Sequence, residues 1–245
     1  MRVRPVELAE LLKRISRVTY QDTALTSGRQ WHLDPATEFG QRLLTEGTYD
    51  ANAVAAFQQV LRPGDTFVDA GANEGWFSVM AAERVGPQGL VLAVEPQARL
   101  WPVINRNFLL NRLNNFVLVP FALGAAEGQT EVILYPSLNT GATSLVAGAR
   151  TRYRTRQPIG ILPLARLCEI HRLSSIRLMK IDVEGFEMEA LKGAGDWLGR
   201  IEHIFVEMHP PQLQALGTSV EAVERLLQSR GYRPRQIGGV DFWSL

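Results

Sequence analysis

The sequence contains very little cysteine and no excess of charge of either sign. Cys168 is the only cysteine among the 245 residues, so an internal disulfide and a zinc site built from several thiolates are both excluded. The 26 basic and 25 acidic side chains leave a formal net charge of +1, which removes the overall attraction that nucleic-acid-binding and membrane-surface proteins use. We therefore expect a protein of a reducing compartment that binds neither nucleic acid nor membranes.

Long hydrophobic runs are absent as well. Runs such as 90–94 are far shorter than the roughly 18 apolar residues that a membrane span requires. A secretory signal needs an unbroken apolar stretch, but in the first residues Leu8, Leu11 and Ile15 are separated by charged residues at the spacing of an amphipathic helix. We therefore expect a cytoplasmic protein.

The first 47 residues are expected to form an extension of the main domain, which covers 48–245. The amphipathic helix, over 5–17, is a candidate lid or dimer arm, so a homodimer through this helix is one expectation. Residues 18–47 are predicted to be irregular around a hairpin at 31–34. Simple packing over the domain is the alternative for the whole extension.

The main domain alternates short apolar runs with helical stretches. Strands are expected at 66–70, 90–95, 117–122, 178–183 and 204–208 and from Tyr232, and helices at 51–61, 76–84, 97–110, 187–192 and 219–228. This alternation is typical of parallel βαβ units, and it predicts an α/β fold with a doubly wound, mostly parallel sheet. Residues 130–135 are expected to add an edge strand, and 136–158 a long loop.

A turn with two glycines follows the first strand of this domain. In the turn at 69–75, DAGANEG, Gly71 and Gly75 allow close approach of the backbone, and the first amides of the next helix offer hydrogen-bond donors. Glu95 comes twenty positions after Gly75, at the end of the next strand, where doubly wound folds place a carboxylate on ribose hydroxyls. We expect a ribose-bearing cofactor; a tight turn and a surface glutamate are the alternative.

The residues of the turn favour one such cofactor over another. Asn73 stands where a dinucleotide fingerprint has its middle glycine, and Asp69 adds a negative charge. Because like charges repel at close range, this turn suits a ligand with an ammonium and a sulfonium better than a pyrophosphate. We therefore expect S-adenosylmethionine, with S-adenosylhomocysteine as its product, in preference to NAD.

Ionisable side chains follow two predicted strands. Asp182 and Glu184 end one buried strand, and Glu207 and His209 end the next. Residues two apart on a strand share a face, so each pair should project together at the edge where parallel sheets bind ligands. Burying this much charge without purpose is costly, which indicates a catalytic group. Lys180 is expected to be an ion-pair partner rather than a nucleophile.

His209 is a natural proton acceptor for methylation of an alcohol, because its unperturbed pKa of about 6.5 lies near working pH and Glu207 could orient it. Asp182 is the other candidate base, or a contact of the donor's amino group. Three alternatives stay open: prolines 210–211 could hold His209 as a structural residue, Glu184 could cap the next helix, and these side chains could bind Mg²⁺ or Mn²⁺. A metal is not favoured.

Four arginines alternate near the end of the predicted long loop, at 150, 152, 154 and 156. On an extended chain they lie on one side, where Arg152 and Arg154 are candidates for recognising a phosphate or carboxylate of the substrate. A solvated edge strand protected by charge is the alternative.

These segments together resemble the FkbM-type methyltransferases, which are class I S-adenosylmethionine-dependent enzymes. The matching pieces span roughly 45–210 and keep their order: 64–65, 69–75, 95–96, the helix to Asn111, 122–124 with Gly128, and 180–185. Residues 47–50 resemble a further family element, with Asp50 where the family usually has Glu, and this makes Tyr49 a candidate for substrate binding. Another departure is Leu164-Ala165, where family members commonly have Leu-Asp.

The resemblance implies a seven-stranded class I sheet and a set of cofactor contacts. It places Asp69, Gly71, Asn73 and Gly75 around the methionine part of the donor, Glu95 on the ribose, and Ala122 and Leu123 near the adenine, with Ala72 and Pro96 completing the site.

The acceptor is the least constrained part of the prediction. The resemblance favours O-methylation of a hydroxyl on a sugar, polyketide or other secondary metabolite. Amine methylases often carry an Asn/Asp-Pro-Pro-aromatic turn where this chain has 182–185, which weighs against planar amines. N-methylation of a peptide or amine is the alternative, and a nicotinamide-dependent oxidoreductase and a non-catalytic module that binds polyanions are weaker ones.

Overall fold

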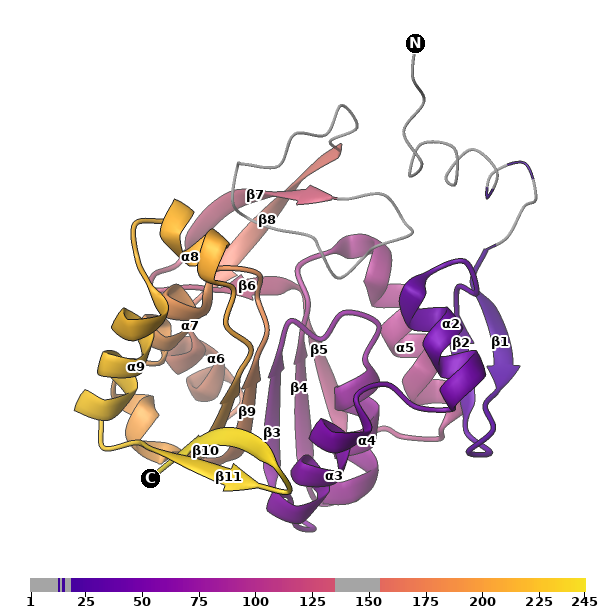
Figure 1. The fold of residues 1–245 in the computed structure, drawn as a ribbon, viewed down its shortest axis with the longest axis horizontal. Coiled ribbons are helices and arrows are strands. Elements are labelled where there is room, and N and C mark those ends of the chain that lie inside the picture. Colours follow the sequence, from indigo (N-terminus) through magenta and orange to yellow (C-terminus); the bar gives the residue numbers. More distant parts are fainter. Residues whose placement is uncertain (1–12, 14, 16–18, 135–154) are drawn as a thin grey trace.

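The computed structural model describes residues 13, 15, 19–134 and 155–245. The helix expected over 5–17, with its dimer arm, therefore lies largely outside the described residues, as do Arg150, Arg152 and Arg154. A sheet with helices on both faces forms the centre of the described part (Figure 1).

The central sheet has seven strands, of which five are parallel. These are β5 (Phe116–Val119), β4 (Leu90–Val94), β3 (Thr66–Ala70), β9 (Ile176–Ile181) and β10 (Ile201–Val206). A C-terminal hairpin of β11 (Arg233–Ile237) and β12 (Val240–Ser244) adds antiparallel strands next to β10. The order β11-β12-β10-β9-β3-β4-β5 confirms the doubly wound, mostly parallel prediction, and its switch point lies between β3 and β9.

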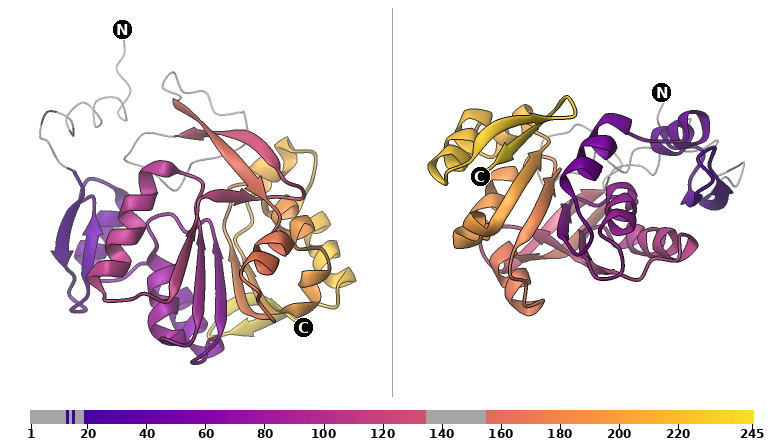
Figure 2. Two further views of the ribbon diagram at one scale, coloured as in Figure 1. Left: turned by 180° about the vertical axis from the view of Figure 1, so that it is seen from behind. Right: turned by 90° about the horizontal axis from the view of Figure 1, so that it is seen from below.

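Alternation along β3 separates two hydrophobic cores. Phe67 packs in a core with α3 (Ala51–Val60), α4 (Trp76–Val85) and α5 (Trp101–Leu110). Val68 packs in the other core, with α6 (Leu164–Ile170), α7 (Glu187–Ala194) and α9 (Val220–Ser229). Because successive side chains point to opposite faces, a strand covered on both sides carries apolar residues on both faces, as Phe67 and Val68 do in β3. Figure 2 shows the same layers from behind and from below.

The segment ahead of residue 47 is more regular than the sequence predicts. Strands β1 (Gln21–Ala24) and β2 (Gln30–Leu33) pair antiparallel, and α2 (Glu38–Glu46) follows them, where we expect irregular structure around a hairpin at 31–34. Thr37 caps α2, since its side chain accepts a hydrogen bond from the amide of Gly40. Trp31 is fully buried in the core that contains Phe67, so the hairpin packs directly on the main domain.

Pro120 divides the strand expected over 117–122. The residues before it form β5, whereas those after it form β6 (Phe121–Leu123), which belongs to a separate sheet with β7 (Gly128–Leu134) and β8 (Thr155–Leu162). A proline has no amide hydrogen to donate to a ladder, so the two halves pair with different neighbours. The prediction of a loop to residue 158 is wrong, because β8 begins at Thr155. The β6-β7-β8 sheet lies above the central strands in Figure 1.

The remaining connections are short. Two 3-10 turns, η1 (Ala98–Leu100) and η2 (Gly195–Arg200), precede α5 and β10. A short helix, α8 (Pro210–Ala215), follows β10, and the sequence analysis does not predict it. No helix in the described ranges has the length and apolar character needed to cross a membrane.

Candidate functional site

A pocket opens at the carboxyl ends of β3, β4 and β9, beside the switch point. It is lined by Ala70, Gly71, Asn73, Val94, Glu95, Pro96, Gln97, Phe121, Ala122, Leu123, Val132, Asp182, Val183, Glu184 and Phe186. Seven of the ten residues assigned to the cofactor from the sequence are among these, and the other three, Asp69, Ala72 and Gly75, are not. The contributions of Phe121, Val132 and Phe186 are not predictable from the motifs, because they depend on how β6, β7 and α7 pack.

The glycine turn presses against the loop that follows β9. Gly71 has a φ of +83°, and a Cβ atom there would lie 1.8 Å from the carbonyl oxygen of Asp182, so only glycine fits. Asn73 also has a positive φ, of 50°, and its Oδ1 atom is buried without a hydrogen-bond partner in the described structure. An unpaired buried acceptor costs about 1–3 kcal/mol, and a donor group on a ligand would satisfy it.

Glu95 closes the pocket where β4 ends. Its side chain is buried, and its two carboxylate oxygens accept from the amides of Asn73 at 2.8 Å and Gln97 at 2.9 Å. Burial raises the pKa of Glu95 to about 7, although both hydrogen bonds oppose this change. The side chain of Gln97 also forms a hydrogen bond with this carboxylate. A carboxylate has about four acceptor sites, so Glu95 can still accept a hydrogen bond from a ligand hydroxyl.

Behind the turn, a buried lysine joins two carboxylates. The Nζ atom of Lys180 lies 3.3 Å from Oδ1 of Asp69 and 3.2 Å from Oδ2 of Asp182, and donates to the carbonyl of Gly71 at 3.1 Å. Burial lowers the pKa of Lys180, but the charges of Asp182 and Asp69 outweigh it and raise that pKa. Lys180 is the ion-pair partner that we expect, and it ties the glycine turn to the loop after β9.

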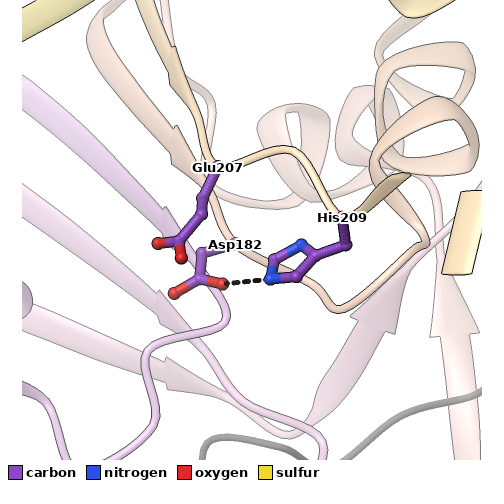
Figure 3. A group of neighbouring side chains, drawn as sticks. All are labelled: Asp182, Glu207 and His209. Carbon is purple, nitrogen blue, oxygen red and sulfur yellow. Dashed lines mark ion pairs between the residues drawn. The ribbon is translucent and has the colours of Figure 1, made fainter. Parts of the chain in front are cut away.

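Asp182, Glu207 and His209 point toward one another beyond the ends of β9 and β10 (Figure 3). One ligand atom from each lies within 4.8 Å of the others, a spacing at which they could hold a metal ion. His209 Nε2 lies 3.7 Å from Oδ1 of Asp182 and 3.7 Å from Oε1 of Glu184. The side chains meet in loops rather than on shared strand faces, because β9 ends at Ile181 and β10 at Val206.

The residue that orients His209 is Glu187, and the sequence indicates Glu207 instead. His209 Nδ1 lies 2.8 Å from Oε1 of Glu187, which is fully buried at the start of α7 and also accepts from the amide of Gly185. Burial lowers the pKa of His209, but the hydrogen bond to Glu187 and the charge of Glu184 outweigh it and raise that pKa to about 9. The pKa of His209 therefore lies above its ordinary value of 6.5, and the imidazole carries a proton at neutral pH.

Carboxyl groups outnumber cations around His209. Burial, with the charges of Asp182 and Glu207, raises the pKa of Glu184 to about 7, although His209 opposes it. Burial and Asp182 also raise the pKa of Glu207. Glu184 does not cap α7, whose first turn is preceded by Phe186 without a side-chain hydrogen bond. Glu184 is therefore the side chain of this group that binds and releases a proton near neutral pH.

Tyr49 lies near the carboxylates of this group. Burial, followed by the negative charges of Glu207 and Asp182, raises the pKa of its hydroxyl. Its carbonyl accepts from Trp76 Nε1 at 2.8 Å, and the guanidinium of Arg42 lies 4.7 Å from the centre of its ring. The phenol is thus held beside the carboxylates.

Of the four alternating arginines, the structure describes Arg156. It lies in β8 and pairs with Glu131 of β7 at 2.8 Å, with both side chains more than half exposed. Arg152 and Arg154, the two substrate-binding candidates, are outside the described residues.

The family model and two relatives that match this chain are described as methyltransferases. The family model described as the methyltransferase FkbM domain matches residues 69–234. A relative named methyltransferase 1, from Beauveria bassiana, is 30% identical over 190 residues, covering 69% of this chain and 73% of the relative. Methyltransferase sdnD of Sordaria araneosa is 29% identical over 201 residues, covering 69% and 74%.

A solved structure of a SAM-dependent methyltransferase from Aquifex aeolicus is similar at 15% identity. It covers 83% of this chain and 90% of its own, with a TM-score of 0.43.

Proposed function

Because the chain belongs to the family of methyltransferases with an FkbM domain, we propose that it transfers a methyl group from S-adenosylmethionine to a hydroxyl group of a small molecule. The observation that supports this most is the position of Asp182, which lines the pocket and also lies 3.7 Å from His209. A ligand site and an acid–base group thus share one wall. The acceptor class is a sugar, polyketide or other secondary metabolite.

The pocket residues fit the donor group by group. S-adenosylmethionine, when bound, supplies an electrophilic methyl group on its sulfonium. The unpaired Oδ1 atom of Asn73 would accept from the ammonium, and the remaining acceptor site of Glu95 would accept from a ribose hydroxyl. Ala122 and Leu123, both buried in the pocket wall, would contact the adenine.

The acid–base group supplies the proton acceptor that an alcohol requires. A hydroxyl must lose its proton as its oxygen is methylated, and the neutral form of His209 takes that proton at Nε2. Glu187 holds Nδ1 and stabilises the imidazolium that results. Asp182 and Glu184, both 3.7 Å from Nε2, favour the charged form for the same reason.

Calorimetric titration tests the donor. We expect S-adenosylmethionine and S-adenosylhomocysteine to bind, NAD not to bind, and Glu95→Gln to weaken binding about tenfold, because hydrogen bonds to a charged group contribute about 1.5–3 kcal/mol. Glu131→Gln, a carboxylate of β7 outside the pocket, is the matched control. Binding of NAD, or equal affinities for the wild type and Glu95→Gln, would contradict this assignment.

Product analysis tests the acceptor. Alcohols, amines and peptides are incubated with donor that carries a labelled methyl group, and mass spectrometry locates the label. We expect the methyl group on oxygen. Label on nitrogen alone would establish the alternative, N-methylation of an amine or peptide.

Chelation with EDTA tests whether turnover requires a metal ion. We expect the rate to be unchanged after chelation. The ammonium of Lys180 already lies 3.2 Å from Asp182, so one of the three candidate ligands has a cation beside it. Initial rates are compared before chelation, after it, and after addition of Mg²⁺ or Mn²⁺. A rate that falls on chelation and returns only with the metal would instead assign Asp182, Glu207 and His209 to a metal site.

A further inference from the structure

Gln157 connects the sheet above the pocket to the loop that follows Glu95. Its Nε2 atom donates to the carbonyl of Pro96 at 2.8 Å, and its Oε1 atom accepts from the amide of Ala98 at 3.1 Å. Because a carbonyl needs a donor and an amide needs an acceptor, only one orientation of the carboxamide makes both bonds. One side chain therefore holds both ends of the turn at 96–98.

The turn also has hydrogen bonds of its own: the amide of Gln97 donates to Oε1 of Glu95 at 2.9 Å, and Oε1 of Gln97 accepts from the guanidinium of Arg99 at 2.8 Å and 3.0 Å. It follows the last residue of β4, and Pro96 has no amide hydrogen with which to join a ladder. Glu95 is fixed before the turn by Trp101, whose Nε1 atom donates to its carbonyl at 2.7 Å. The two bonds from Gln157 differ from these because they come from the β6-β7-β8 sheet, so they fix the position of the turn relative to that sheet.

The position of Gln157 in β8 directs it to the pocket. It pairs in register with Val132 of β7, which lines the pocket. Ile159, two residues further along β8, is buried with Val132 and Ala122. Residues two apart on a strand, and residues directly opposite on neighbouring strands, share a face. Gln157 is therefore on the pocket side of the β6-β7-β8 sheet.

We propose that Gln157 is a positioning residue for the cofactor. It holds the turn that presents Glu95, Pro96 and Gln97 to the pocket, and it sets the affinity for the nucleoside part without contacting the reacting atoms. The inference rests on the proposed function, since it assumes that this pocket takes S-adenosylmethionine.

Binding of S-adenosylhomocysteine, measured by calorimetry, tests this inference. Gln157→Ala is expected to raise the dissociation constant about tenfold, since both hydrogen bonds from Gln157 to the turn are lost, and to leave kcat at saturating donor unchanged. The isosteric Gln157→Glu keeps the acceptor for Ala98 but sets oxygen against the carbonyl of Pro96, so it should also weaken binding. Gln129→Ala is the matched control, because Gln129 is an exposed residue of β7.

Amide hydrogen exchange in the ligand-free protein gives a second readout. The amide of Ala98 should exchange faster in Gln157→Ala than in the wild type, and at the wild-type rate in Gln129→Ala, with circular dichroism showing that both variants are folded. If Gln157→Ala does not fold, binding of S-adenosylhomocysteine to Gln157→Glu decides the inference, because this variant loses the bond to Pro96.

The outcomes separate this inference from the proposed function. Unchanged affinity in Gln157→Ala, or equal weakening in Gln129→Ala, overturns the role of Gln157 while leaving the donor assignment intact. A wild-type protein that binds no S-adenosylhomocysteine overturns the donor assignment, and the inference with it.

Discussion

Replacing Lys180 with methionine is expected to lower the free energy of unfolding by about 3–5 kcal/mol, the usual cost of removing one partner of a buried ion pair. Lys180 and Asp69 are 2% and 0% exposed, and their charged atoms lie 3.3 Å apart. Without the ammonium, Ser78 is left as the hydrogen-bond partner of a fully buried carboxylate. One hydroxyl does not compensate a buried charge.

Urea unfolding followed by circular dichroism measures this loss. Lys192→Met is the control, because Lys192 pairs with Glu189 at 2.8 Å on the surface, where an ion pair contributes at most about 1 kcal/mol. The double variant Lys180→Met, Asp69→Asn should recover part of the stability, since it removes the stranded charge. A loss below about 1 kcal/mol in Lys180→Met would show that Asp69 is not charged in the native state.

The deficit of Lys180→Met should grow with pH. Burial raises the pKa of Asp69 even with Lys180 present, and removing the ammonium raises it further. The folded variant then binds a proton at Asp69 that the unfolded chain has released, so its stability falls as the pH rises above the unfolded pKa of about 3.9. A deficit of the same size at acidic and neutral pH would contradict this account.

The second large effect concerns turnover. His209→Gln is expected to lower kcat by about 10²–10⁴, the range for a lost general base, and to leave binding of S-adenosylhomocysteine unchanged, because His209 does not line the pocket. His171→Gln, at the end of α6, is the control for loss of a histidine elsewhere. Initial rates with an alcohol acceptor test whether His209 is the base. A His209→Gln variant with wild-type kcat would show that it is not.

The pH dependence gives the same residue a second test. With the pKa of His209 at about 9, kcat/KM should rise with pH up to that region, since only the neutral imidazole accepts a proton. Glu187→Gln removes the charge that stabilises the imidazolium, so the midpoint of the rise should move to lower pH. Stability depends on pH in the opposite direction to kcat/KM. The contribution of protonated His209 to the free energy of unfolding is complete below its ordinary pKa of 6.5 and is lost as the pH rises through about 9. His209→Gln should lack both dependences.

Much of the pocket lining is predictable from the sequence for a local reason. A strand, a turn with Gly71 and Gly75, a helix and the carboxylate of Glu95 follow one another directly, and each signal is contained in a short stretch of chain. The apolar runs at β3 and β4 predict buried parallel strands in the same way, because both of their faces are covered.

The errors arise where distant contacts decide the structure. An apolar run does not show at which residue the hydrogen bonds between strands end. The sequence therefore predicts a strand that includes Asp182, whereas β9 ends at Ile181. From the sequence, Glu187 is only an acidic residue in the first turn of a predicted helix. Its hydrogen bond with His209 joins residues that are far apart in the chain, so no local pattern predicts it. Pro120 is a visible interruption, but the partner that β6 takes instead, β8, is selected by packing.

The contact between Gly71 and the carbonyl of Asp182 has a consequence for how such a protein can acquire new substrates. Backbone touches backbone there, so the spacing between the donor pocket and the group around His209 is set by the pairing of β3 with β9 and not by exchangeable side chains. Glu207 and His209 come from beyond β10, and Tyr49 precedes α3; these positions can vary without moving the donor. Acceptor preference can therefore diversify on a fixed donor platform.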